Sequence, residues 1–390
     1  MPASPQGSPR RPGPSTRAVH AGDPEAAVGG SVVQPIYQTT TFFSEPDGTG
    51  EVLYTRYLNN PNHRALEARI AALEGAEDCV VLGSGMAALV AALLACVRGG
   101  EHVVAADALY GGTLTLLDRE FPRLGIETTY VDFADPRWPD ALRPTTRALL
   151  VETPTNPLVR VVDLRPIAAQ ARARGIPLVV DATFASPFNF RPLEHGADLS
   201  MHSLTKYLGG HSDVTGGCVS GPRALVDEVR QRARIFGAVL DPHAAWLVER
   251  GVKTLAVRMP RHNRNGEEVA RWCERQPQVA RVHHPALASH PDHALAAELL
   301  GGGGGMMTIE LRGGGEAAAR FVRALRLCTL APSLGGVETL VSEPRYTSHA
   351  ALSPEERARR GLPDGTVRFS LGIEDAEDII ADIRQALAAL

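Results

Sequence analysis

The first half of the chain alternates short apolar runs with segments of helical spacing. Helical segments include His63–Leu73 and the alanine-rich Ala87–Val97. The apolar runs suit buried strands, and they are Cys79–Leu82, His102–Ala105, Ile126–Val131, Ala148–Glu152 and Leu178–Asp181. Strands that alternate with helices are typical of an α/β fold with a mostly parallel sheet. We therefore predict an α/β fold for this part of the chain.

Beyond about Asp241 the pattern changes to long helices followed by a mixture of strands and helices. The predicted elements are helices at Trp246–Leu255 and Arg258–Gln276, strands at Met306–Leu311 and Thr366–Leu371, and a final amphipathic helix at Ala376–Leu390. These elements indicate a smaller α+β domain.

The N-terminal region lacks the pattern of a packed core. Residues 1–14 are rich in Pro, Gly and Ser, so we expect them to be disordered, and Ser15–Gly50 shows no helical period. Such an arm is expected to lie on another surface, for example that of a second subunit. We thus divide the 390 residues into a tail and arm at 1–52, a large domain at 53–242 and a small domain at 243–390.

Several polar residues stand at or just after the ends of the predicted strands. They are Tyr110, Glu152, Asn156, Asp181 and Thr183. Ligands of parallel α/β sheets bind outside the carboxyl ends of the strands, so we expect these side chains to share a site. Asp181 has two interpretations: a helix cap or turn residue, or a buried carboxylate that needs a cationic or hydrogen-bonding partner.

The turn Gly83-Ser84-Gly85-Met86 lies between a predicted strand and a predicted helix. This layout aims backbone N–H groups and the positive end of the helix at an anion, although such turns also occur simply for close packing. The turn lacks the lysine and hydroxyl residues that end a P-loop, so an ATP site is not expected.

Lysine is almost absent from this chain. Lys206 and Lys253 are its only two lysines, whereas arginine fills the other long cationic positions. A guanidinium cannot deprotonate to form an imine, but a desolvated lysine amine can attack an aldehyde or ketone. The hydroxyls of Ser203 and Thr205 flank Lys206 and suit a phosphate next to such an imine. The alternative, an ordinary surface lysine, fits Lys253 better.

Composition excludes several classes of function. The formal net charge is −4 with 22% charged residues, and there is no basic stripe of the kind that binds nucleic acid. No apolar stretch is long enough for a membrane span, and the first residues do not resemble a signal peptide. The five cysteines have no paired metal-type spacing, so no metal is expected, and a reducing cytoplasm fits best.

Taken in order, the motifs of the chain resemble the Cys/Met-metabolism (trans-sulfuration) family of pyridoxal-phosphate (PLP) enzymes, specifically the cystathionine γ-synthase and γ-lyase group. The resemblance runs from about Thr16 to the C-terminus. The motifs are YTR (54–56), GSGMAA (83–88), YGGT (110–113), ETPTNP (152–157), VVDATFASP (179–187), HSLTKY with GHSD (202–213), SLGGVETL (333–340) and VRFSLGIED (367–375).

The resemblance implies the fold-type I PLP-dependent transferase fold, PLP as cofactor, and a homotetramer made of dimers that share active sites. It implies that Lys206 holds the cofactor, that Asp181 keeps the pyridine nitrogen protonated, and that Tyr110 stacks on the ring and transfers protons. Thr183 would support the ring.

The resemblance also assigns the remaining site residues. The cofactor phosphate would be bound by Gly85, Met86, Ser203 and Thr205, and by Tyr54 and Arg56 of a neighbouring subunit. The substrate carboxylate would be bound by Asn156, Ser333 and Arg368, whose guanidinium can bind both oxygens.

The implied activity is γ-elimination or γ-replacement on small homoserine-type amino acids. Gly112 differs from the cysteine that methionine γ-lyases carry there. Because Gly112 has no side chain to close the pocket, we expect open space beside it that admits a bulky γ substituent such as that of cystathionine. Glu338 after Gly335-Gly336 is closer to cystathionine enzymes than to acylhomoserine sulfhydrylases. The alternatives are an O-acylhomoserine sulfhydrylase or a related enzyme of specialised metabolism and, less favoured, a fold-type I aminotransferase. YTRYLNNP has one residue more before its proline than the family pattern.

Overall fold

The computed structural model describes residues 12–23, 28–347 and 361–390, together with Ala350, Ser353, Glu355 and Arg357. The strands are β1 Asp78–Leu82, β2 His102–Ala106, β3 Glu127–Val131, β4 Thr146–Glu152, β5 Leu178–Asp181, β6 Leu199–Ser203, β7 Gly217–Gly221, β8 Val279–His283, β9 Met306–Leu311, β10 Thr329–Leu330, β11 Leu340–Ser342 and β12 Thr366–Ser370.

The α-helices are α1 Pro14–His20, α2 Pro61–Glu74, α3 Gly85–Cys96, α4 Gly111–Thr115, α5 Phe121–Arg123, α6 Leu164–Arg174, α7 Ser186–Asn189, α8 Arg223–Phe236, α9 Pro242–Val252, α10 Leu255–Cys273, α11 His293–Leu299, α12 Gly314–Ala324 and α14 Ala376–Leu387. Short 3₁₀ segments are η1 Val28–Gly30, η2 Thr55–Tyr57, η4 Trp138–Ala141, η5 Pro192–His195 and η6 Pro344–Tyr346, and η3 Leu116–Glu120 is a π-helix.

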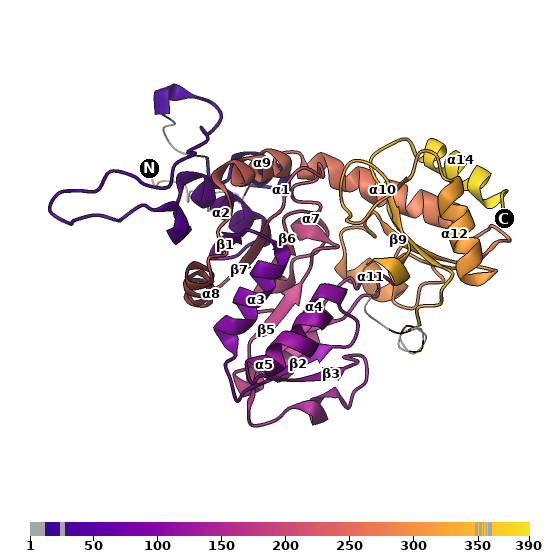
Figure 1. The fold of residues 1–390 in the computed structure, drawn as a ribbon, viewed down its shortest axis with the longest axis horizontal. Coiled ribbons are helices and arrows are strands. Elements are labelled where there is room, and N and C mark those ends of the chain that lie inside the picture. The colour runs from indigo at the N-terminus through magenta and orange to yellow at the C-terminus, as the bar shows by residue number, and fades with distance from the viewer. Residues whose placement is uncertain are drawn as a thin grey trace, which may run out of the picture.

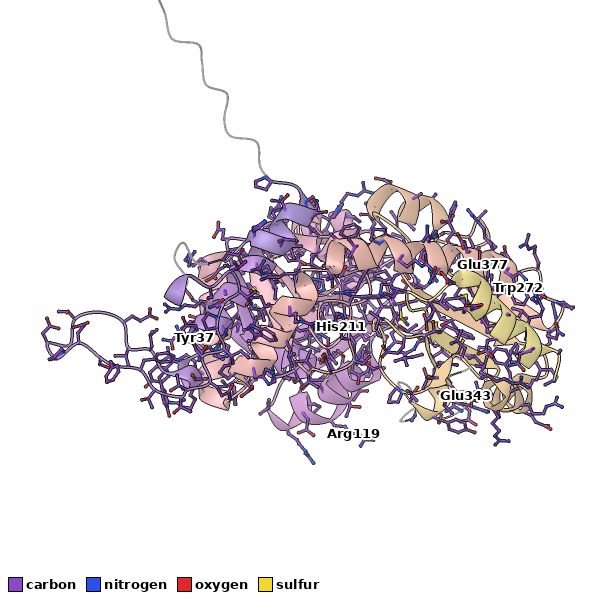
Figure 2. All side chains as sticks on the ribbon, turned by 90° about the horizontal axis from the view of Figure 1, so that it is seen from above. Tyr37, Arg119, His211, Trp272, Glu343 and Glu377 are labelled. Atoms are coloured by element: carbon purple, nitrogen blue, oxygen red, sulfur yellow. The ribbon has the colours of Figure 1, made fainter. Side chains whose placement is uncertain are left out.

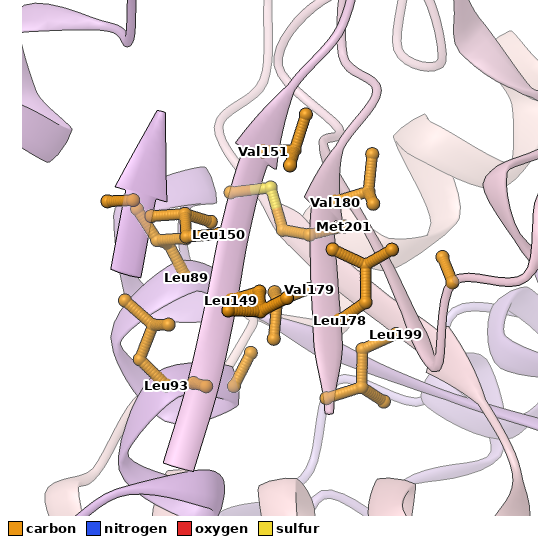
Figure 3. Close-up of a cluster of buried hydrophobic side chains, with 14 of the residues drawn as sticks. Leu89, Leu93, Leu149, Leu150, Val151, Leu178, Val179, Val180, Leu199 and Met201 are labelled. Carbon is orange, nitrogen blue, oxygen red and sulfur yellow. The ribbon is translucent and has the colours of Figure 1, made fainter. Parts of the chain in front are cut away.

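A seven-stranded sheet occupies the middle of the molecule (Figure 1). Its order is β1-β7-β6-β5-β4-β2-β3, and only β7 runs antiparallel to its neighbours. The segments Ala148–Val151 of β4 and Leu178–Val180 of β5 are apolar and buried because helices cover both faces of this part of the sheet. Figure 3 shows Leu89 and Leu93 of α3 beside Leu149 and Leu150 of β4. The predicted α/β fold with a mostly parallel sheet is confirmed.

A second sheet, with the order β10-β11-β12-β9-β8, forms the C-terminal part together with α12 and α14. It has its own apolar core, which includes Phe321, Phe369 and Ile379. The helix α10 runs from the first part toward the second (Figure 1). The predicted smaller α+β unit is therefore present, whereas the boundaries at 52/53 and 242/243 stay predictions, because sheet membership alone does not define a unit that folds by itself.

The N-terminal arm differs in part from expectation. Most of the segment predicted to be disordered, residues 1–11, lies outside the described residues, but Pro14–His20 forms the helix α1, although no helical period was recognised there. This helix is stabilised by α2, because Arg69 Nη1 donates a 2.9 Å hydrogen bond to the carbonyl of Ala18. Part of the arm beyond α1 also packs on the body, since the N–H of Tyr37 donates to Asn62 Oδ1 of α2 at 2.7 Å. Figure 2 shows Tyr37 far from Trp272 in the C-terminal part.

The strand order brings the ends of β4, β5 and β6 together. Glu152 pairs with Asp181, and Asp181 pairs with Met201. These residues face the C-terminal sheet, in which Arg368 lies on β12 between β11 and β9. Among the described residues, no helix is both long and apolar enough to cross a membrane.

Candidate functional site

A cavity of about 550 Å³ lies between the strand ends of the large sheet and the C-terminal part. Of the thirteen residues to which the sequence assigns a role in the site, all except Tyr54 and Arg56 line this cavity. Those eleven are Gly85, Met86, Tyr110, Asn156, Asp181, Thr183, Ser203, Thr205, Lys206, Ser333 and Arg368.

One end of the cavity is built from the ends of β5 and β6. Thr183 donates to Asp181 Oδ1 through its backbone N–H at 3.0 Å and its hydroxyl at 2.5 Å. The same Thr183 hydroxyl accepts the N–H of Ser203 at 3.0 Å, which ties the two strand ends together. Burial raises the pKa of Asp181 even though the Thr183 bonds oppose the shift, because a carboxylate charge is costly away from water. Asp181 therefore favours a cationic partner inside the cavity.

Lys206 follows β6 and is held by a loop of the C-terminal part. Its Nζ donates to Ser333 Oγ at 2.8 Å. Burial, together with the nearby positive charge of Arg368, lowers the pKa of Lys206 to about 8. By contrast, Lys253 is the C-cap residue that follows α9, and it forms an ion pair with Glu249 at 3.4 Å, outside the cavity. Lys206 is thus the lysine suited to act as a nucleophile near neutral pH.

The N-terminus of α3 meets the β6 end at very short range. Ser84 caps the helix by accepting the N–H of Ala87 at 3.0 Å. A Cβ at Gly85 would lie 2.8 Å from Ser203 Cβ, so only glycine permits this approach. The first backbone N–H groups of a helix have no acceptor within the helix, and together with the hydroxyls of Ser203 and Thr205 they suit an anion.

The opposite end of the cavity carries a buried guanidinium. Arg368 Nη1 donates to Asn156 Oδ1 at 3.1 Å, and Nη2 donates to the carbonyl of Ser333 at 3.1 Å. Burial lowers the pKa of Arg368 to about 10, so the group stays protonated at neutral pH. Ser333 has φ of 88°, and in this conformation its hydroxyl meets Lys206 while its carbonyl meets Arg368. An anionic group of a ligand would neutralise this end.

Sequence reasoning did not assign roles to several other residues of the cavity. Those residues are Ser84, Thr113, Glu152, Phe184, Met201, Thr215, Pro332, Leu334, Tyr346 and Thr347. Some had a signal, since Ser84, Pro332 and Leu334 adjoin predicted site residues, and Glu152 was expected at the same sheet edge. Tyr346 had none, because η6 is brought to the cavity only by tertiary packing.

Tyr54 and Arg56 lie outside the cavity of their own chain. The guanidinium of Arg56 is exposed, donates to the carbonyl of Arg234 at 3.3 Å, and lies 5.7 Å and 5.2 Å from the ring centroids of Tyr54 and Tyr57. Within one chain, the structure does not bring these two predicted residues to the other eleven.

Comparison with known proteins agrees with this geometry. Residues 15–388 match the family described as Cys/Met metabolism PLP-dependent enzyme. The L-methionine γ-lyase of Pseudomonas putida is 43% identical over 98% of this chain and 99% of its own length. The chain belongs to this family. The cystathionine γ-lyase of Bacillus subtilis is 41% identical over 95% of this chain and 98% of its own.

The family assignment extends to the fold. The crystal structure of cystathionine γ-synthase from Xanthomonas oryzae pv. oryzae, in complex with aminoacrylate and cysteine, matches with a TM-score of 0.93 and 39% identity, over 97% of this chain and 98% of that one. The predicted PLP-enzyme fold is confirmed, and the chain is a PLP-dependent enzyme.

The cavity of this Cys/Met-metabolism enzyme fits pyridoxal phosphate chemically. The ligand needs an amine that can be neutral near pH 7–8, a carboxylate for a protonated ring nitrogen, and donors for a phosphate. Lys206 has a lowered pKa, and the half-buried carboxylate of Asp181 accepts its hydrogen bonds from the neutral donor Thr183. The glycine at position 85 leaves the helix N-terminus open beside Ser203.

Proposed function

We propose that this enzyme catalyses γ-elimination or γ-replacement on homoserine-type amino acids, with cystathionine or an O-acylated homoserine as substrate. The observation that carries the proposal is one cavity that Lys206 shares with the half-buried carboxylate of Asp181 and the buried guanidinium of Arg368. Bound pyridoxal phosphate would supply an electron sink for the charge left at the substrate α-carbon.

The residues of the cavity have different proposed roles, according to where they lie. Arg368 and Asn156 bind the substrate carboxylate. The backbone carbonyl of Ser333 and the side chain of Asn156 accept hydrogen bonds from Arg368 and hold its guanidinium in place. Lys206 removes the Cα proton and returns protons, since its amine is poised near neutral pH. Asp181 keeps a proton on the ring nitrogen of the cofactor, and that cation relieves the cost of burying the carboxylate.

The phosphate and the ring are held by the remaining large-domain groups. The N–H groups of Gly85 and Met86 and the hydroxyls of Ser203 and Thr205 bind the phosphate. Tyr110 lines the cavity and is 42% exposed, and it would stack on the bound cofactor and assist proton transfer. Thr183 supports the ring from the Asp181 side.

Substrate preference rests on Gly112, for a reason that differs from the one expected from the sequence. The expected empty space beside Gly112 is absent, because a Cβ there would lie 2.5 Å from Tyr110 Cε1 and 3.2 Å from Met86 Sδ. Glycine instead lets the Tyr110 ring lie back against α4. We propose that this widens the cavity for a bulky γ substituent such as that of cystathionine.

The test uses purified holoenzyme with L-cystathionine, L-methionine, and O-acetyl- or O-succinylhomoserine with and without cysteine, with products identified by mass spectrometry. We expect cystathionine or acylhomoserine to react about 10–200-fold better than methionine, the range that a few buried carbons provide. Gly112→Ala, which crowds the ring, should reduce that ratio. Methionine as the best substrate, or the absence of γ-chemistry with all of these, would overturn the proposal. Thioether formation marks a synthase, and 2-oxobutyrate with cysteine marks a lyase.

We further propose a cytoplasmic homotetramer in which Tyr54 and Arg56 complete the phosphate site of a neighbouring subunit. Their position outside their own cavity supports this, as do exposed apolar side chains on the arm and at the end of α8, such as Phe43, Ile235 and Phe236. Arg56→Ala and Lys206→Ala chains, each nearly inactive alone, should regain part of the activity when co-assembled. A verified mixed oligomer without recovery would show that each site is built within one chain.

A further inference from the structure

Glu152 is a carboxylate in a place that otherwise favours apolar side chains. It ends β4, and the four preceding residues, Ala148 to Val151, are fully buried and apolar. Its own side chain is only 4% exposed and lines the cavity. Burial, and then the nearby charge of Asp181, raises the pKa of Glu152 well above its usual range. A charge with this cost needs compensating hydrogen bonds.

Both carboxylate oxygens of Glu152 accept hydrogen bonds from backbone N–H groups of different segments. Oε2 accepts the N–H of Tyr110 at 2.7 Å, and Oε1 accepts the N–H of Asn156 at 2.9 Å. Tyr110 is the residue that precedes α4, and Asn156 lies in the loop after β4. Asn156 in turn accepts a hydrogen bond from Arg368. One carboxylate therefore connects the aromatic wall of the cavity with its guanidinium end.

From this geometry we infer that Glu152 is a positioning residue, which sets the distance between the Tyr110 ring and the Asn156–Arg368 pair. The inference rests on the proposed function for the roles of those residues. Peptide N–H groups can only donate, so two of them facing one side chain require two acceptor atoms, and only a carboxylate supplies both. An amide supplies one acceptor and turns its NH₂ group toward the other donor.

The chain offers a matched control in Glu67 of α2. Glu67 is also a buried carboxylate, 7% exposed, and its Oε1 accepts the N–H of Val81 at 3.1 Å. Burial raises its pKa to about 8, and it lies outside the cavity. Glu67→Gln thus reproduces the loss of a buried carboxylate without touching the Tyr110–Asn156 connection.

The experiment compares Glu152→Gln, Glu152→Asp and Glu67→Gln as holoenzymes. Glu152→Gln keeps the length but loses one acceptor, and Glu152→Asp keeps both oxygens but is too short to reach both N–H groups. We expect each Glu152 variant to raise KM and to lower kcat/KM by about tenfold or more, and to change the circular dichroism of the bound cofactor, because the Tyr110 ring moves. Glu67→Gln should change only the melting temperature.

Two outcomes would overturn the inference. In the first, both Glu152 variants have the same kcat, KM and cofactor dichroism as the wild type. In the second, Glu67→Gln shows the same changes as the Glu152 variants. If Glu152→Gln fails to fold, Glu152→Asp carries the test. The dichroism is measured without substrate, so it separates this inference from the proposed reaction. A wild-type enzyme without γ-chemistry would contradict the reaction while a dichroism change confined to the Glu152 variants would still support the positioning role.

Discussion

The two ends of the cavity are built in different ways. At the cofactor-ring end proposed here, Asp181 and Lys206 come from the ends of the adjacent parallel strands β5 and β6, only 25 residues apart in the chain. At the carboxylate end, Asn156, Ser333 and Arg368 come from a loop of the large sheet, a loop of the C-terminal part and the strand β12.

The charges differ between the two ends as well. Burial raises the pKa of Asp181 and lowers those of Lys206 and Arg368, so the ionised form of each of these three groups is less favourable than it would be in water. Both ends therefore favour ligands of opposite charge: a ring cation at Asp181 and a carboxylate at Arg368. We therefore expect the catalytic step to depend on the cofactor-ring end and substrate binding on the carboxylate end. Four experiments test this difference.

The largest effect is expected from the amine of the ring end. Lys206→Arg should lose activity by at least about 10⁴-fold and lose the visible absorbance of covalently held cofactor, because a guanidinium cannot form the bond. The control is Lys253→Arg, which keeps the ion pair with Glu249 and should behave like the wild type. A persisting cofactor band in Lys206→Arg would show that another group holds the cofactor.

A smaller but still large effect is expected at the carboxylate of the same end. Asp181→Asn should fold and bind the cofactor but reduce kcat by roughly 10²–10³-fold, since a neutral amide cannot keep the ring nitrogen protonated. Asp198→Asn removes a carboxylate that accepts the N–H of Leu178 outside this cavity, and it should leave kcat unchanged. Near wild-type turnover in folded Asp181→Asn would contradict the proposed role of Asp181 in keeping the ring nitrogen of the cofactor protonated.

At the carboxylate end the loss should appear mainly as weaker binding. Arg368→Lys keeps a positive charge but cannot hold Asn156 and Ser333 together while binding both oxygens of the substrate, so KM should rise by roughly 10–150-fold with a smaller change in kcat. The control is Arg261→Lys, which alters a cation bonded to Asp375 outside the cavity. A loss confined to kcat would instead place Arg368 in the chemical step.

The smallest effect concerns the coupling of the two ends. With the apoprotein, acylation of Lys206 should follow a midpoint near pH 8, because burial and Arg368 both disfavour the charged amine and the neutral form is the one that reacts. Arg368→Met should move this midpoint upward. Mass spectrometry of the peptide that contains Lys206 measures it, with Lys253 as the second labelled site. An unchanged midpoint in Arg368→Met would mean that burial alone sets the pKa.

Much of the ring end was predictable from the sequence. The strands β1 to β5 were recognised by their apolar runs, and Asp181 stood out as a charged residue at the end of one of them. Lys206 stood out because arginine has replaced lysine almost everywhere else. Such local patterns predict the site correctly, because the carboxyl ends of parallel strands lie at the same edge of a sheet.

Other features had no local signal. The helix α1 was missed because its stability depends on Arg69 of α2, which donates to the carbonyl of Ala18 at the C-terminal side of that short helix. The space beside Gly112 was misjudged because the filling atoms belong to the side chain of Tyr110, two residues away but folded back onto it. The bridging role of Glu152 was also hidden, since its partners are backbone groups.

The sequence by itself determined the α/β alternation, the single lysine suited to the site, and the family to which the chain is similar, because these depend on residue type and order along the chain. Tertiary structure alone decided that Arg368 approaches Lys206 closely enough to lower its pKa, that Glu152 joins Tyr110 to Asn156, and that Arg56 lies outside its own cavity. These are matters of distance between segments far apart in sequence, and electrostatic and hydrogen-bond energies depend on that distance and on burial.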